Sequence, residues 1–253
     1  MTAAELPTVG FLCMVRGTGA ELPAYRARLA ELDQLGRDHG LFSVHVTVVD
    51  NGCDALHDVL GYSALWTNPA ATGVGFSAAV ADPAEPIDGW IDTFVVARDD
   101  CPHFPSTEIS PERWRHMNWL ANVGLAAMPD VDLVAVVHPD LEWEPEQMLR
   151  AIDWTLNLDE LVVAACPVFT RSGAYYDTWG TRVDGVRVGP LFDPDDPGRY
   201  GDVTSAAGAL LAPGIARHVP WSGDAEVGWC ERLGRYGIAT WLLSADTCRV
   251  VHP

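Results

Sequence analysis

Short apolar runs alternate along the chain with longer stretches that have helical spacing. The apolar run Val9–Arg16 predicts a buried strand, and apolar positions within Pro23–His39 predict a helix. The β-branched, alternating run Ser43–Val49 predicts a second strand, which ends at Asp50-Asn51-Gly52. Strand, helix and strand with short connections indicate a right-handed βαβ unit and a parallel sheet.

The same alternation continues toward the C-terminus. Ser110 as a cap and Pro111 at the first position mark the start of a helix. The Gly- and Ala-rich stretch 68–81 predicts a loop that feeds a helix, and the aromatic stretch 171–202 predicts a long loop of the kind that carries function. The remaining expected elements are strands at 93–97, 132–137, 161–165 and 239–243, an ordered segment at 206–211, and helices at 110–128, 145–155 and 226–236.

Composition narrows the class of protein. The chain has 253 residues, 48% of them hydrophobic, which suits a globular domain, and we find no repeat and no linker that would divide it. Asp and Glu outnumber Lys and Arg by 35 to 16, a net charge of −19, so neither nucleic acid nor an anionic membrane is an expected partner. All 16 basic residues are Arg, which excludes a phosphate-loop lysine, a pyridoxal Schiff base and a lysine nucleophile.

Cysteine usage and the apolar runs indicate a cytoplasmic protein. The six cysteines are scattered without a Cys-x-x-Cys pair, as expected of buried, reduced thiols. The N-terminus has no basic flank before its apolar stretch, so we expect no secretory signal. No apolar run approaches the roughly 20 residues that a membrane-spanning helix needs.

Acidic residues at the predicted strand ends and helix starts are the main candidates for chemistry. Asp140 and Glu142, just past a buried strand, could both reach a hard divalent cation near phosphates, or form an ordinary acidic loop. Asp50 and Asn51 could bind a nucleoside or make a tight turn. Glu226, at a predicted helix start behind Asp224, could act as a base on a hydroxyl group or be a plain helix-start carboxylate.

Histidine, serine and glycine patterns argue against other enzyme classes. There is no His-Glu-x-x-His pair, no Gly-x-Ser-x-Gly elbow and no complete dinucleotide fingerprint around Gly73-Val74-Gly75. His252 is either a metal ligand or an exposed terminal residue. The aromatic residues Tyr176 and Trp179 around Asp177 could stack on sugar rings or be buried in the core.

Together these pieces resemble a nucleotide-sugar glycosyltransferase of the GT-A type. Residues 134–192 are similar to the Cap59-like mannosyltransferases of fungal capsule synthesis, in the acidic strand end, the Ala-Ala-Cys strand and the Tyr-Asp-Thr-Trp…Arg-x-x-Gly segment. Residues 115–125 resemble that family's Arg…Asn-x-x-Leu helix, with Ala121 in place of a second Arg. Residues 226–232 are similar to the acid-Val-x-x-Cys-x-Arg segment of family-2-like transferases.

The resemblance implies an α/β, GT-A (nucleotide-diphospho-sugar transferase) fold with a Rossmann-like, mostly parallel central sheet flanked by helices. Residues 1–253 would form one such domain, with a nucleotide-binding half at 1–140 and an acceptor and catalytic half at 141–253. Mn²⁺ or Mg²⁺ would be held by Asp140 and Glu142, with His252 as a third ligand, and Glu226 and Asp224 would lie on the catalytic side. The donor would be bound by Arg16, Asp50, Asn51, Asn68, Arg115, Tyr176, Asp177, Trp179, Arg182 and Asp184.

The implied reaction moves a mannose-like hexose from a GDP- or UDP-linked sugar to a small-molecule, glycan or lipid-carried acceptor. The Cap59-like segments suggest retention of stereochemistry and the Glu226 segment suggests inversion, so both stay open. His138 stands where the family often has another polar or acidic residue. A homodimer is included among the expected partners. The alternatives are a nucleotide- or sugar-binding scaffold without turnover and a sugar nucleotidyltransferase.

Overall fold

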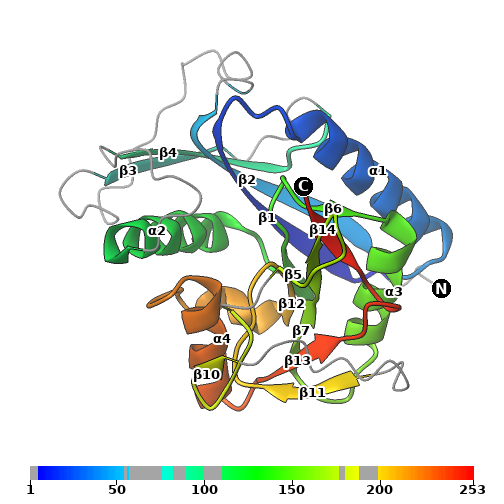
Figure 1. The fold of residues 1–253 in the computed structure, drawn as a ribbon. Coiled ribbons are helices and arrows are strands. Elements are labelled where there is room, and N and C mark those ends of the chain that lie inside the picture. The colour runs from blue at the N-terminus through cyan, green and yellow to red at the C-terminus, as the bar shows by residue number, and fades with distance from the viewer. Residues whose placement is uncertain are drawn as a thin grey trace.

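The structure is a computed structural model, and it describes residues 5–53, 56, 76–81, 89–99, 110–176, 180–187 and 199–253. Within these residues a nine-stranded sheet with the order β11-β13-β7-β12-β5-β1-β2-β4-β3 forms the centre (Figure 1). Its strands are β1 (Thr8–Gly17), β2 (Ser43–Cys53), β3 (Phe76–Ala81), β4 (Thr93–Asp99), β5 (Leu133–Val136), β7 (Val162–Cys166), β11 (Arg199–Val203), β12 (Ala209–Pro213) and β13 (Ala239–Leu243).

The central sheet is mostly parallel. The strands β1, β2, β4 and β5 pair in parallel, as do β7 and β13. Between these two groups β12 runs antiparallel to both β5 and β7, and the edge strands β3 and β11 are antiparallel to their neighbours. The strands β5, β7 and β12 are buried along their whole length, which explains their nearly continuous apolar sequences.

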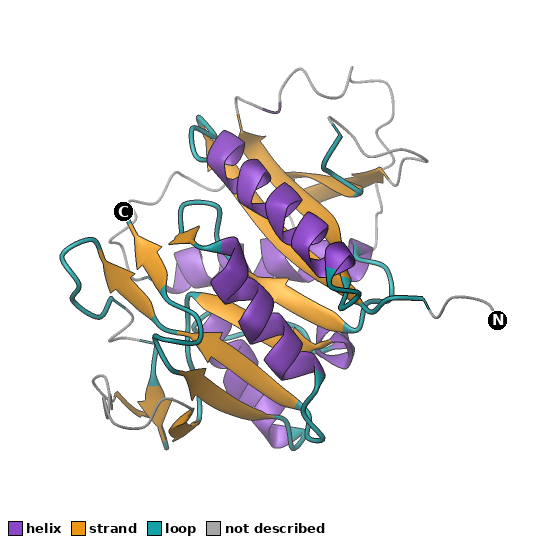
Figure 2. Cartoon of the chain, turned by 90° about the vertical axis from the view of Figure 1, so that its right-hand side faces the viewer, coloured by secondary structure: helices purple, strands orange, loops and turns teal. Residues whose placement is uncertain are grey.

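Helices cover both faces of the sheet. On one face lie α1 (Leu22–Asp38) and α3 (Pro145–Leu156), which are turned toward the viewer in Figure 2. On the other face lie α2 (Pro111–Ala127), the 3₁₀ helix η3 (Gly214–His218) and α4 (Glu226–Arg235). Each face has its own cluster of buried apolar side chains. The Ser110 hydroxyl accepts a hydrogen bond from the Arg113 N–H and caps α2, as the sequence predicted.

Two small sheets lie beside the central sheet, near the edge at which its parallel strands end. The strands β6 (Glu142–Trp143), β14 (Val250–His252) and β8 (Val168–Thr170) form one of them, with β14 in the middle. The hairpin of β9 (Arg182–Val183) and β10 (Val186–Arg187) forms the other. Because β14 pairs with β6, the C-terminus lies beside the turn that follows β5 (Figure 1).

The sequence-based assignment of elements was wrong at four places. The strand β2 does not end before Asp50 but continues through it to Cys53, since β1 and β4 pair with it there. Residues 76–81 form strand β3 rather than a helix, because they pair antiparallel with β4. The expected loop 171–202 includes β9, β10 and the start of β11. The C-terminal tail forms strand β14.

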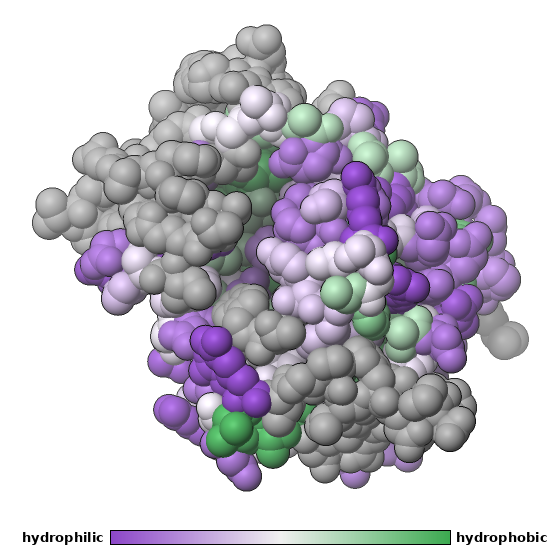
Figure 3. Space-filling view, viewed as in Figure 1, coloured by the Kyte–Doolittle hydropathy of each residue, from purple (hydrophilic) through white to green (hydrophobic). Residues whose placement is uncertain are grey.

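The surface of the described residues is largely polar. The large hydrophobic side chains exposed there are Leu161, Tyr176, Val186, Ile215 and Tyr236. In the view of Figure 3, green hydrophobic colour is confined to small areas among purple and white ones. Within the described part of the chain, no helix combines the length and the apolar character that crossing a bilayer requires.

Candidate functional site

The polar candidates gather at the carboxyl edge of the central sheet. Asp50 and Asn51 lie near the end of β2, and His138 and Asp140 follow the end of β5. The crevice outside the carboxyl ends of parallel strands is where open α/β sheets bind ligands. Glu226, from the first turn of α4, reaches the same edge by contacting His138.

Glu226 is a buried carboxylate with an unequal environment at its two oxygens. Its Oε1 lies 2.7 Å from His138 Nε2, and the residue is only 3% exposed. A carboxylate only accepts hydrogen bonds, so Nε2 of His138 carries the hydrogen. The other oxygen, Oε2, is buried and accepts no hydrogen bond from the described residues. A buried oxygen without a hydrogen-bond donor costs free energy of folding, which makes Oε2 a candidate to accept a hydrogen bond from a ligand or water.

The turn directly before α4, which places Glu226 beside His138, has a strained backbone. Ala225, directly before it, has φ 53° and ψ −121°, a conformation that favours glycine, and its side chain is fully buried. Gly228 allows the helix to approach the turn, because a Cβ there would lie 1.7 Å from the Ser222 carbonyl oxygen. The turn is therefore held in one conformation by close packing against α4.

Two amides on α2 anchor the segment that leads into this turn. Asn122 donates to the Trp221 carbonyl (3.1 Å) and accepts from the Trp221 N–H (2.6 Å). One helical turn earlier, Asn118 Nδ2 donates to the Gly223 carbonyl (3.0 Å). That contact fixes the amide so that its buried Oδ1 accepts no hydrogen bond from the described residues. A second acceptor oxygen beside the turn thus awaits a donor.

The predicted metal ligands come together only in part. His252 Nε2 lies 3.5 Å from Asp140 Oδ2, across the contact that β14 makes with β6. The His252 ring is stacked on Tyr176, with ring centres 4.2 Å apart and an angle of 10° between the planes. Tyr176, expected on the donor side, thereby orients the imidazole.

Glu142 points to a different partner. Arg171 donates to Glu142 Oε1 at 2.6 Å, and both side chains are largely exposed. Among the described residues no three His, Cys, Asp or Glu side chains converge as a metal cluster. Asp140 and His252 are a carboxylate and an imidazole close enough together to be candidate ligands of one cation.

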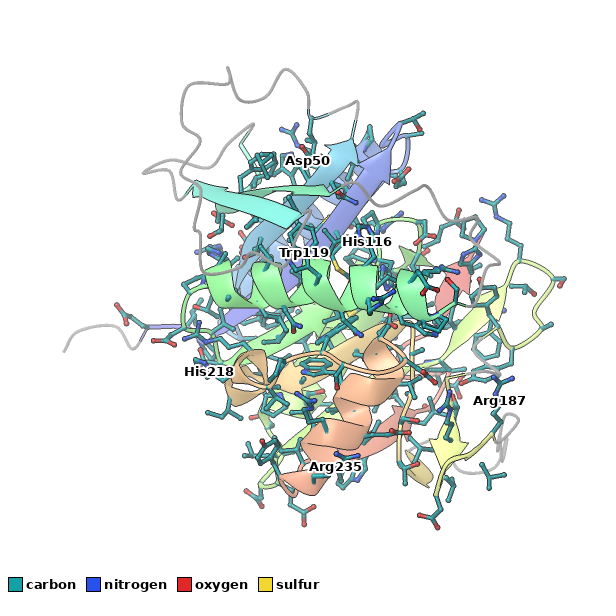
Figure 4. The ribbon with its side chains drawn as sticks, turned by 90° about the vertical axis from the view of Figure 1, so that its left-hand side faces the viewer. Asp50, His116, Trp119, Arg187, His218 and Arg235 are labelled. Carbon is teal, nitrogen blue, oxygen red and sulfur yellow. The ribbon has the colours of Figure 1, made fainter. Side chains whose placement is uncertain are left out.

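The polar pair at the end of β2 is buried in the molecule. Asp50 Oδ1 accepts a hydrogen bond from the Cys53 N–H at 2.7 Å, which holds the end of the strand. Asn51 Nδ2 donates to His116 Nε2 at 2.9 Å, and His116 comes from α2. Figure 4 shows Asp50 above α2, and it labels His116 and Trp119 on that helix. The contact between Asn51 and His116 ties the end of β2 to α2.

The arginine and aspartate candidates have local partners. Arg182 donates to Asp224 Oδ2 at 2.9 Å and lies 3.8 Å from Glu231, so it joins hairpin β9–β10 to the start of α4. Asp184 lies exposed in the turn of that hairpin with φ 50°, beside Gly185 with φ 77°, and an Asp-Gly pair with positive φ is what such a turn requires. Arg115 is exposed on α2 and pairs with Glu112 three residues earlier.

Four predicted site residues have side chains outside the described part of the chain. Asn68, Asp177 and Trp179 lie outside the described residues. Arg16 belongs to β1, at an irregularity in its pairing with β2, and its side chain lies outside the description.

Sequence reasoning missed three residues at this edge: His116, Asn118 and the role of His138. His138 stands two residues after the fully apolar strand β5, which is a signal that could have been used. His116 and Asn118 occupy a helix of mixed polarity, and only the packing of α2 against β2 and against the turn before α4 reveals them.

Comparisons with known proteins show the fold. No family profile and no curated protein sequence matches the chain. Among solved structures it is similar to GalNAc-T7, crystallised with UDP, GalNAc and Mn²⁺, at 10% identity and a TM-score of 0.51. That match covers 98% of this chain but only 43% of GalNAc-T7. A weaker match, at 10% identity and a TM-score of 0.44, is the inositol-1-phosphate CTP transferase of T. maritima, with 96% and 88% of the two chains covered.

The fold class is therefore the one that the sequence predicted. The chain has an α/β fold with a mixed, mostly parallel central sheet, matching structures of the nucleotide-diphospho-sugar transferase kind.

Proposed function

We propose that this chain is a metal-dependent glycosyltransferase that moves a hexose from a nucleotide diphosphate sugar to a hydroxyl group. One observation carries the proposal: a buried carboxylate with an unpartnered oxygen and a carboxylate–imidazole pair both lie at the end of β5, Glu226 against His138 and Asp140 against His252. A glycosyl transfer needs these two functions, a proton acceptor and a site for the leaving diphosphate.

Asp140 and His252 are the residues that would hold the cation. Mn²⁺ accepts both carboxylate and imidazole ligands, and both side chains are partly exposed, so water and phosphate oxygens can complete the coordination. A bound Mn²⁺ or Mg²⁺ would neutralise negative charge on the leaving diphosphate. The cation matters because the chain contains no lysine, and Arg171 and Arg182 are already paired with carboxylates.

Glu226 would act as the base. Its Oε2 takes the proton of the acceptor hydroxyl while the acceptor oxygen forms a bond to the anomeric carbon. The bond from that carbon to the diphosphate breaks, and the diphosphate leaves with the electron pair. Direct attack by an acceptor activated in this way inverts the anomeric configuration, so the base role proposed for Glu226 implies inversion.

The first experiment is a thermal-shift panel of GDP, UDP, ADP, TDP and CDP, each with and without Mn²⁺. We expect one diphosphate to stabilise the protein in a Mn²⁺-dependent way, by about 2.7 kcal/mol at a hundredfold excess over Kd. D140N should abolish the dependence on metal, whereas E142Q should reduce it less, because Glu142 faces Arg171. A shift that ignores Mn²⁺ would contradict the metal role.

The second experiment separates the classes of transferase. The protein is incubated with the sugar nucleotides of the diphosphate found in the panel, and separately with a nucleoside triphosphate plus a sugar 1-phosphate. Release of nucleoside diphosphate supports glycosyl transfer. Release of pyrophosphate in the other mixture would mean nucleotidyl transfer, and binding without any product would mean a binding protein.

A further inference from the structure

Glu226 is held from one side only. His138 Nε2 donates to Oε1, while Oε2 is enclosed without a donor among the described residues. A freely rotating carboxylate would turn to satisfy both oxygens or to reach water. Burial, at 3% exposure, keeps bulk water away from Glu226, so among the described residues the hydrogen bond from His138 is the contact that sets the direction of the carboxylate.

The backbone around Glu226 is equally fixed. The strained Ala225 and the close approach of Gly228 to Ser222 leave the first turn of α4 no room to slide. The side chain of Glu226 can therefore change its direction only through its own torsion angles.

His138 itself is fixed on both sides along the chain. The carbonyl of the preceding Val137 accepts a hydrogen bond from the Tyr25 hydroxyl at 2.9 Å, and the His138 carbonyl accepts one from the Leu141 N–H at 3.1 Å. Tyr25 belongs to α1, and its side chain is completely buried. The imidazole thus extends from a rigid strand end, which lets it act as a fixed donor.

We infer that His138 is a positioning residue for the Glu226 carboxylate: it binds Oε1 and thereby directs Oε2 toward the acceptor hydroxyl. This inference rests on the proposed function, since it gives the base its orientation. It requires only the Nε2–H donor of His138.

The test is a matched pair of amides, H138Q and H138N. The glutamine amide nitrogen reaches about as far as Nε2 of histidine, whereas the asparagine amide is shorter by one methylene. E226Q removes the carboxylate itself. H218Q is the control, because His218 is an exposed histidine of η3, after the opposite end of β12, and lies across the molecule from the hairpin residue Arg187 in Figure 4.

Three quantities are measured for each variant: kcat and KM for the sugar nucleotide found in the panel, the Kd of its nucleoside diphosphate with Mn²⁺, and the crystal structure around Glu226. E226Q should lower kcat by about 10²- to 10⁴-fold. H138N should lower kcat by at least about tenfold, with KM and Kd unchanged, and its carboxylate should turn away from residue 138. H138Q should recover most of kcat and keep the carboxylate in place, and H218Q should equal the wild type.

Several results would overturn the inference. A wild-type kcat in H138N would do so, as would a Glu226 carboxylate that stays in place in the H138N crystals. An increased Kd for the Mn²⁺ complex in both amide variants, like that of D140N, would identify His138 as a metal ligand instead. If the wild type binds no nucleoside diphosphate, the proposed function fails, and the crystal structures of H138N and H138Q still decide whether His138 orients Glu226.

Discussion

A single methyl group at Gly228 tests whether the turn before α4 is as rigid as the structure indicates. In G228A the new Cβ would lie 1.7 Å from the Ser222 carbonyl oxygen, whereas real Cβ atoms stay at least 3.0 Å from such a neighbour. The turn and the helix must therefore separate by about 1.3 Å, the difference between these two distances. The segment that has to move is the one that Asn118 and Asn122 bind.

The cost follows from what this movement breaks. Three hydrogen bonds join the segment to the two amides on α2, and each contributes about 0.5–1.5 kcal/mol. We expect G228A to lose about 1.5–4.5 kcal/mol of unfolding free energy, or roughly 3–18 °C in Tm. Because Glu226 lies two residues away, turnover of the sugar nucleotide should fall as well.

The matched control is G234A on the same helix. A Cβ at Gly234 meets no atom within 4 Å, so this variant should gain up to about 1 kcal/mol from the higher helix propensity of alanine. Urea denaturation followed by the fluorescence of the ten tryptophans measures both variants. Equal stability of G228A and G234A, within about 0.5 kcal/mol, would refute the reasoning.

Three further predictions concern the cation, the pH dependence and a helix cap. H252Q should raise the Kd of the Mn²⁺–diphosphate complex at least about tenfold in calorimetry, and E144Q, which changes an exposed carboxylate nearby, should leave it unchanged. Burial raises the pKa of the Cys230 thiol to about 11. Below the ordinary pKa of a thiol this shift has no effect on the unfolding free energy, but as pH rises toward 11 the unfolded chain ionises first and the folded protein loses stability. The unfolding free energy should fall by about 2–3 kcal/mol between pH 9 and 11, and less in C230A; an equal slope in both proteins would count against this. S110A should destabilise the protein by about 1 kcal/mol through loss of the α2 cap, and an unchanged urea midpoint would contradict that role.

Local sequence signals determined most of the fold. The apolar runs of β5 and β7 predicted strands, and Ser110 with Pro111 predicted the start of α2. These signals depend on residues close together in the chain, on burial of apolar runs and on satisfaction of the first N–H groups of a helix. The alternation of strand and helix then predicted a mostly parallel sheet, which the structure confirms.

The signals failed where a segment's conformation depends on a distant partner. Residues 76–81 are rich in alanine and suit a helix, yet pairing with β4 makes them a strand. The tail 250–252 carries no strong pattern of its own, and its place between β6 and β8 makes it a strand. In both cases hydrogen bonds from another part of the chain override local propensity.

The candidate site divides in the same way. The sequence alone supplied the chemical types, carboxylates at strand ends and at a helix start, and it supplied Glu226, Asp140 and His252 as candidates. The family resemblance had already grouped Asp140 with His252, but only the tertiary structure paired Glu226 with His138, 88 residues apart, and separated Glu142 from Asp140 and His252 by pairing it with Arg171. Composition and spacing fix which groups a chain can offer, but the direction of a side chain is fixed by the elements that pack around it, and those come from all parts of the sequence.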